Sequence, residues 1–173
     1  MDQRSLVLLG LLMAQSQHGY QINEFIENNL SMITNMKKPT AYATLDKLSK
    51  QGFIEVSTER EGNRPPRKVY SINPKGKDYF YELLHENLSS GEAVQYEGDI
   101  GLMFIEHLPL DTAISALQNR LSKTEESYQM FHGMPIHGKA TGVNLAIRHK
   151  IKMLEAEIIF LKETIEDLRK QSS

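Results

Sequence analysis

The sequence predicts a mainly α-helical protein with one small β-hairpin, divided into two regions. Apolar residues recur along most of the chain at a spacing of about 3.6, which is the period of a helix. Around residues 53–72 the spacing changes to about two, the period of a strand. The chain has 173 residues, of which 40% are hydrophobic, so two small domains can each bury a core.

Three helices are expected before the hairpin. The first should cover residues 4–14 and bury Leu6, Leu9 and Met13 on one face. The second follows Gly19. The third begins near Pro39, because proline fits the first helical turn, where its missing N–H would be unpaired anyway, and it ends at Gly52. Its buried stripe is expected at Ala41, Leu45 and Leu48.

The hairpin and a fourth helix complete the first region. Residues 53–56 and 68–72 are predicted strands, and the turn residues Gly62, Pro65 and Pro66 lie between them. Asn73 and Pro74 supply an N-cap and a first-turn proline for the fourth helix. The polar segment 89–91 then divides the chain into domains at residues 1–90 and 91–173.

The second domain should be entirely helical. A short helix is expected over residues 99–108, a longer one over about 110–131, and a last one over 143–170. At about 1.5 Å per residue, the last helix would be roughly 40 Å long.

This order of elements is that of a winged helix-turn-helix domain followed by a C-terminal helical dimerisation domain. In a winged helix-turn-helix domain the third helix enters the major groove of DNA. The net charge of −2 for the whole chain argues against a nucleic-acid partner. Between residues 35 and 77, however, there are ten Lys and Arg side chains and four acidic ones. Local positive charge governs phosphate binding, so DNA is the expected partner.

The candidate DNA-binding residues lie on the third helix and on the hairpin, or wing. On the helix they are lysines and small side chains expected off the buried stripe: Lys37, Lys38, Thr40, Ala43, Thr44 and Lys47. On the wing they are basic side chains around the turn: Arg60, Arg64, Arg67 and Lys68. A solvated helix face and a solvated hairpin are the alternative interpretations.

Three segments of the first region resemble the PadR family of bacterial regulators. They read LGLLMAQSQHGYQINEFI (residues 9–26), PTAYATLDKLSKQGFIEVS (39–57) and NRPPRKVYSINPKGKDYF (63–80). The resemblance implies that Tyr42 and the wing contact DNA, that His18 and Tyr20 lie near the phosphate backbone, and that the protein represses transcription. The chain departs from the family pattern at Lys37-Lys38-Pro39, where the family has Ser-x-Gly, and at Ala41, where it has a larger aliphatic residue.

The last helix carries a heptad seam, which requires a partner helix. Its members are Ile147, Ile151, Leu154, Ile158, Leu161, Ile165 and Leu168. The partner could be the helix at 110–131 of the same chain or the same helix of a second copy. Ile159 and Phe160 widen the apolar face beyond one seam, so we expect both contacts and a homodimer.

Other kinds of function have little support in the sequence. It contains no phosphate-binding glycine loop, nucleophile elbow or zinc-protease motif, so neither enzymatic activity nor a cofactor is expected. The six histidines lack the spacing of metal ligands. Several side chains of the second domain suit either an aromatic small-molecule effector or core packing: Tyr96, Met103, Phe104, Tyr128, Met130, Phe131 and Met134.

We therefore expect a cytoplasmic, homodimeric repressor that binds a roughly palindromic DNA operator. The lack of cysteine and of an apolar run of about 20 residues agrees with that location. The alternatives are a winged-helix activator and an adapter whose winged helix binds another protein.

Overall fold

The chain divides into two compact units, Met1–Ala93 and Val94–Ser173, each of which is described by itself. The structure is a computed structural model that describes residues 2–18, 22–28, 36–60, 66–91, 96–134 and 141–170. It is mainly helical, with a single two-stranded antiparallel sheet among the described residues. This confirms the predicted fold class.

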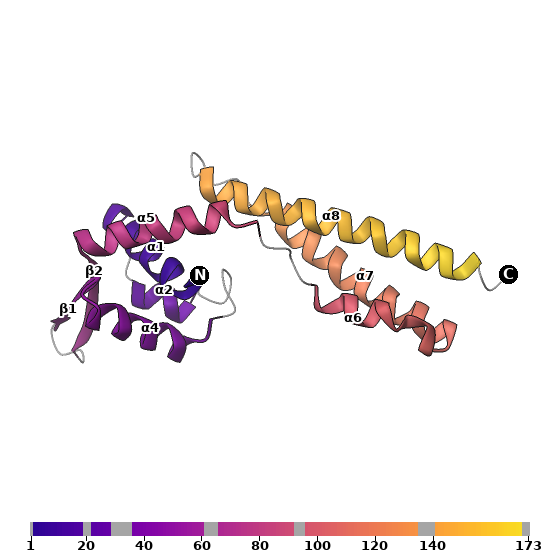
Figure 1. The fold of residues 1–173 in the computed structure, drawn as a ribbon, viewed down its shortest axis with the longest axis horizontal. Helices are drawn as coiled ribbons and strands as arrows, with labels where there is room; N and C mark the ends of the chain where they lie inside the picture. Colours follow the sequence, from indigo (N-terminus) through magenta and orange to yellow (C-terminus); the bar gives the residue numbers. More distant parts are fainter. Residues whose placement is uncertain are drawn as a thin grey trace. The chain divides into compact units, whose positions relative to one another are not determined.

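The first unit contains helices packed around one core, with the hairpin beside the C-terminal half of α4 (Figure 1). Its elements, in chain order, are α1 (Gln3–His18), α2 (Ile22–Asn28), α4 (Lys38–Lys50), β1 (Ile54–Glu59), β2 (Arg67–Ile72) and α5 (Pro74–Ser89). The strands pair antiparallel from Ile54 opposite Ile72 to Glu59 opposite Arg67. The wing is therefore longer than the predicted strand at 53–56.

The core of this unit is made mainly by leucine and isoleucine side chains from α1, α2 and α4. On α1 the buried residues are Ser5, Leu8, Leu9, Leu11 and Leu12, whereas Leu6 and Met13 are only half-buried. Of the predicted face, Leu9 is confirmed, whereas Leu6 and Met13 are wrong because residues 6–14 are almost all apolar and offer no polar contrast with which to orient the helix. On α4 the predicted stripe of Ala41, Leu45 and Leu48 is confirmed.

The end of α4 is joined to the start of α5 by side-chain bonds from Asn73 and Lys75. The Asn73 side chain caps α5 by accepting a hydrogen bond from the Gly76 N–H (2.9 Å), and its amide donates to the carbonyl oxygen of Gly52 (2.9 Å). Lys75 Nζ donates to the carbonyl oxygen of Gln51 (2.9 Å). Gly52 itself has φ 75°, a conformation that favours glycine.

The second unit consists of α6 (Glu97–Met103), a short 3₁₀ helix (Ile105–His107), α7 (Leu110–His132) and α8 (Thr141–Lys170). Figure 1 shows α7 and α8 side by side. Their shared core is small and centres on Leu117 of α7 and on Leu161 and Ile165 of α8, which are 0% and 5% exposed. An ion pair between Arg120 and Glu157 also joins the two helices.

Much of the second unit's apolar surface is uncovered. The exposed large apolar side chains are Tyr96, Ile100, Met103, Phe104, Leu108, Met130, Val143, Leu145, Met153, Ile159 and Phe160. Exposed apolar surface typically marks an interaction site where it is contiguous. Within the described ranges, no helix combines the length and apolar character that crossing a bilayer requires.

Candidate nucleic-acid interface

The outward face of α4 combines basic residues with a small one. Lys38, Ala43, Lys47 and Lys50 are exposed, and Lys37, which precedes the helix, is exposed as well. Because Ala43 has a short side chain, the backbone at the middle of this face can approach a partner closely. The helix has no side-chain cap at Lys37. Its first N–H groups therefore add to the positive potential of the lysines at that end.

Thr44 does not belong to this face, contrary to expectation. It is 8% exposed, and its hydroxyl donates to the carbonyl oxygen of Thr40 (2.8 Å). The prediction treated threonine as a polar surface residue, but a hydroxyl bonded to the preceding helical turn can be buried at little cost. We therefore remove Thr44 from the candidate DNA-contacting residues.

Lys47 lies next to the start of α1. Its Nζ is 3.2 Å from Asp2 Oδ2. Asp2 also caps α1, because it accepts bonds from the Ser5 N–H (3.1 Å) and the Ser5 hydroxyl (2.8 Å). Ion pairs that are this exposed contribute at most about 1 kcal/mol, so a DNA phosphate can replace Asp2 as the partner of Lys47.

The pKa of Asp2 is lowered from its ordinary value of 3.8. Partial burial raises it, but the two bonds from Ser5 and the ammonium group of Lys47 outweigh that effect. A carboxyl whose pKa is lower in the folded state stabilises the fold above its unfolded pKa, and this contribution is lost as the pH falls through the folded value.

Replacement of Asp2 tests this assignment. Asp2→Ala should reduce the free energy of unfolding by about 1 kcal/mol at neutral pH, because the cap is lost. Asp2→Asn keeps the bond from the Ser5 N–H but loses the charge and the Oδ2 acceptor, so it should be slightly less stable than wild type at neutral pH, and its stability should fall less between neutral pH and pH values below 3.8. Urea denaturation at several pH values measures both effects. Identical acid sensitivity in Asp2→Asn and wild type would contradict the assigned role.

The wing is held against α4 by an ion pair between Lys68 Nζ and Asp46 Oδ1 (3.3 Å). The Asn23 side chain of α2 donates to the carbonyl oxygen of Lys68 (2.7 Å), which ties the same strand to α2. Arg67, the first residue of β2, lies 3.6 Å from Glu59 on the paired strand. Lys68 of the wing therefore lies next to Asp46 on the exposed face of α4.

The remaining candidates lie in different settings. Arg60 is exposed at the end of β1, whereas Thr40 and Tyr42 are half-buried, and Tyr42 packs against the core. His18 ends α1, but its side chain lies outside the described residues, as do Tyr20 and Arg64.

Asp46 was not among the candidates, although it lies on the exposed face of α4 three residues after Ala43. It is the one acidic residue in α4. The signal was present in the sequence, because spacing alone places residue 46 beside residue 43 on a helix. Its pairing with Lys68 depends on the fold and was not foreseeable.

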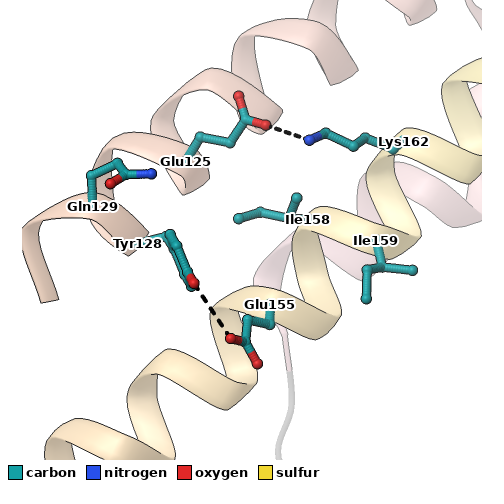
Figure 2. Close-up of a pocket in the computed structure, with 7 residues that line it drawn as sticks. All are labelled: Glu125, Tyr128, Gln129, Glu155, Ile158, Ile159 and Lys162. Atoms are coloured by element: carbon teal, nitrogen blue, oxygen red, sulfur yellow. Dashed lines mark hydrogen bonds and ion pairs between the residues drawn. The ribbon is translucent and has the colours of Figure 1, made fainter. Parts of the chain in front are cut away.

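The second unit has a groove of about 570 Å³ between α7 and α8. Figure 2 shows Tyr128 and Glu125 extending from α7 toward α8, where Tyr128 Oη donates to Glu155 (3.4 Å) and Lys162 lies 2.7 Å from Glu125. Of the predicted effector-pocket residues only Tyr128 lines it. Core packing does not account for Met103, Phe104 or Met130, which are exposed. No group of three potential metal ligands lies within the described ranges.

A helix with a basic outer face, preceded by another helix and followed by a basic antiparallel hairpin, defines a winged helix-turn-helix DNA-binding regulator. The sequence model of the transcriptional regulator PadR-like family matches residues 8–82. An uncharacterized protein of Lysinibacillus sphaericus is 31% identical over 80 residues, which are 46% of this chain and 73% of that protein. The chain belongs to the PadR-like family, which consists of transcriptional regulators and not of enzymes.

The similarity to known proteins extends into the second unit. The negative transcriptional regulator PadR of Bacillus subtilis is 26% identical over 126 residues, 73% of this chain and 69% of that protein. The crystal structure of B. subtilis PadR in complex with operator DNA has a TM-score of 0.78 and 21% identity, and the match covers 97% of this chain and 98% of that one. PadR in complex with p-coumaric acid has a TM-score of 0.72 and 18% identity, with 98% of each chain covered. The fold is therefore shared along nearly the whole chain.

Proposed function

We propose that the protein is a sequence-specific transcriptional repressor that binds a roughly palindromic operator as a homodimer. The observation that carries this proposal is the ion pair between Lys68 of β2 and Asp46 of α4, which places the wing beside the exposed face of α4. On it, Lys37, Lys38 and Lys47 would position α4 in the major groove, while Arg60, Arg67 and Lys68 would contact flanking phosphates. Repression is proposed because the B. subtilis relative is a negative regulator.

The proposed homodimer needs a surface other than the seam centred on Leu161 and Ile165. These two residues are buried against α7, whose Ile114, Leu117 and Leu121 complement them, so they are not available to a second copy. We therefore place the contact of Leu161 and Ile165 within the chain, and not between two copies as expected.

A second apolar stripe on α8 supplies that surface. Leu145, Met153 and Phe160 are exposed and are separated by eight and seven residues. At about 100° per residue they fall within roughly 80° of one another, and Leu161 lies about 80° to 160° around the helix from them. We place the two-fold contact along this stripe. A two-fold axis would then present two α4 helices to successive major grooves, about 34 Å apart.

A small aromatic molecule is the proposed effector. The B. subtilis relative has been crystallised with p-coumaric acid. In this chain the aromatic side chains Tyr96 and Phe104 are exposed, and Phe104 stacks on His107 with the ring centroids 6.2 Å apart. Binding would change operator affinity by favouring one arrangement of the two DNA-binding units over another.

A salt titration of DNA binding tests the proposed interface. Full-length protein is titrated onto fluorescent duplexes from its own upstream region, and affinity is measured by anisotropy at several salt concentrations. Lys38→Ala combined with Arg67→Ala should weaken binding to all duplexes and flatten the log–log slope by about 3.6, because the dimer loses four phosphate contacts and each contributes roughly 0.9. Lys150→Ala, an exposed lysine of α8, is the matched control.

Other outcomes identify the alternatives. An unchanged slope in the double variant would remove α4 and the wing from the interface. No salt-dependent DNA binding by the wild type would favour the protein-binding adapter. A reporter fused to the bound duplex distinguishes repression from activation, since an activator would raise its expression.

A further inference from the structure

We propose that Asp46 determines specificity by accepting a hydrogen bond from the exocyclic amine of a cytosine in the operator. This inference rests on the proposed sequence-specific binding and assigns one base pair to one side chain. Asp46 is on the exposed face of α4, its side chain is 52% exposed, and it lies one helical turn after Ala43. A residue in this position is directed toward the surface that would face the major groove.

The hydrogen-bonding groups of the major groove explain how a carboxylate such as Asp46 on α4 can recognise a base. A carboxylate on a DNA-facing helix is repelled by phosphates, so it reduces affinity unless it finds a donor. Guanine and thymine present acceptor oxygens and would repel it, whereas cytosine presents the N4 amine. Adenine also has an amine, but its adjacent N7 is an acceptor that disfavours a carboxylate and suits an amide instead.

The ion pair with Lys68 makes such a position tolerable. Only Oδ1 of Asp46 is paired with Lys68, at 3.3 Å, in the part of the chain that the structure describes. The ammonium group offsets part of the negative charge of the carboxylate, which lowers its repulsion from DNA phosphates. Asn23 fixes the backbone of Lys68 through its 2.7 Å bond.

Selection from a randomised duplex library, followed by sequencing, tests the proposal on the full-length protein. The wild type should select a C·G pair at one position of each half-site, with a preference of about 5- to 150-fold. Asp46→Ala should lose the preference at that position and retain it elsewhere. Asp46→Asn should shift it toward adenine, because an amide bonds both N6 and N7 of that base. Both variants should bind random DNA more tightly than the wild type.

Lys68→Met distinguishes direct contact of Asp46 with a base from an effect of Asp46 on the wing through Lys68. If Asp46 contacts cytosine, this variant keeps the C·G preference and loses affinity evenly across sequences. If it loses the preference as Asp46→Ala does, Asp46 acts only through Lys68 and the proposal is wrong. An unchanged selected sequence in Asp46→Ala overturns it as well. Failure of the wild type to enrich any sequence would instead overturn the proposed function, and this proposal with it.

Discussion

Replacing Leu161 by aspartate is expected to unfold the α7–α8 pair, whereas replacing the adjacent Phe160 should separate two copies that remain folded. Leu161 is fully buried against α7, and an unpaired carboxylate there costs roughly 4 kcal/mol or more. Phe160 is 43% exposed on the second apolar stripe, so a charge at that position meets water in the separated chain. Neighbouring positions of one helix thus test two different contacts.

Circular dichroism and sedimentation measure the two effects independently. Leu161→Asp should lose helical signal at temperatures where the wild type is folded. Phe160→Asp should keep its helical signal and sediment as a single chain. Ala156→Ser, a mild change at an exposed position of the same helix, serves as the control for both. A Phe160→Asp protein that still sediments as a dimer would show that the stripe is not the two-fold contact.

Gly76→Ala is expected to destabilise the first unit by roughly 3 kcal/mol. A Cβ at residue 76 would overlap the carbonyl oxygen of Phe53 and crowd the Ile72 side chain. The overlapped atom belongs to the backbone and cannot move without disturbing the α4–β1 connection, so the cost should lie at the upper end for overpacking. The distortion would reach the start of the wing as well as α5, because Asn73 bonds to both Gly76 and Gly52.

Gly91→Ala is the matched control for that substitution. Gly91 is exposed, and a Cβ there would meet no atom within 4 Å. Its effect should stay within about 0.5 kcal/mol. Urea denaturation followed by circular dichroism compares the two variants. Equal midpoints for Gly76→Ala and Gly91→Ala would mean that the backbone at residue 76 shifts freely, contrary to the close packing described.

The features predicted well from the sequence are those that local chemistry determines. Asn73 followed by Pro74 indicated the start of α5, and the structure has the Asn73 cap at that position. The stripe of Ala41, Leu45 and Leu48 was clear because its members recur at helical spacing, with Asp46 and Lys47 between the two leucines. Near residue 53 the spacing of apolar residues changes from about 3.6 to about two, and this change predicted the hairpin.

The features that were missed depend on contacts between residues far apart in the sequence, or on a residue that departs from its usual burial. The heptad seam of α8 showed that a partner helix exists, but spacing cannot distinguish α7 from a second copy. Thr44 was predicted on the surface because threonine is polar. The sequence does not show the hydrogen bond from its hydroxyl to Thr40 that allows it to be buried. The pairings of Lys47 with Asp2 and of Lys68 with Asp46 join residues 45 and 22 positions apart. Only the folded chain brings them together.

These pairings have a consequence for how the protein would find its site in a genome. Lys47, Lys68 and Arg67 each have an acidic neighbour within 4.0 Å in the same chain. A phosphate that binds one of them replaces an internal counter-ion, so the gain from an arbitrary stretch of DNA is small. Residence on non-operator sequences would be brief, and the molecule would scan quickly. Prolonged binding would then require base contacts that random sequence does not provide.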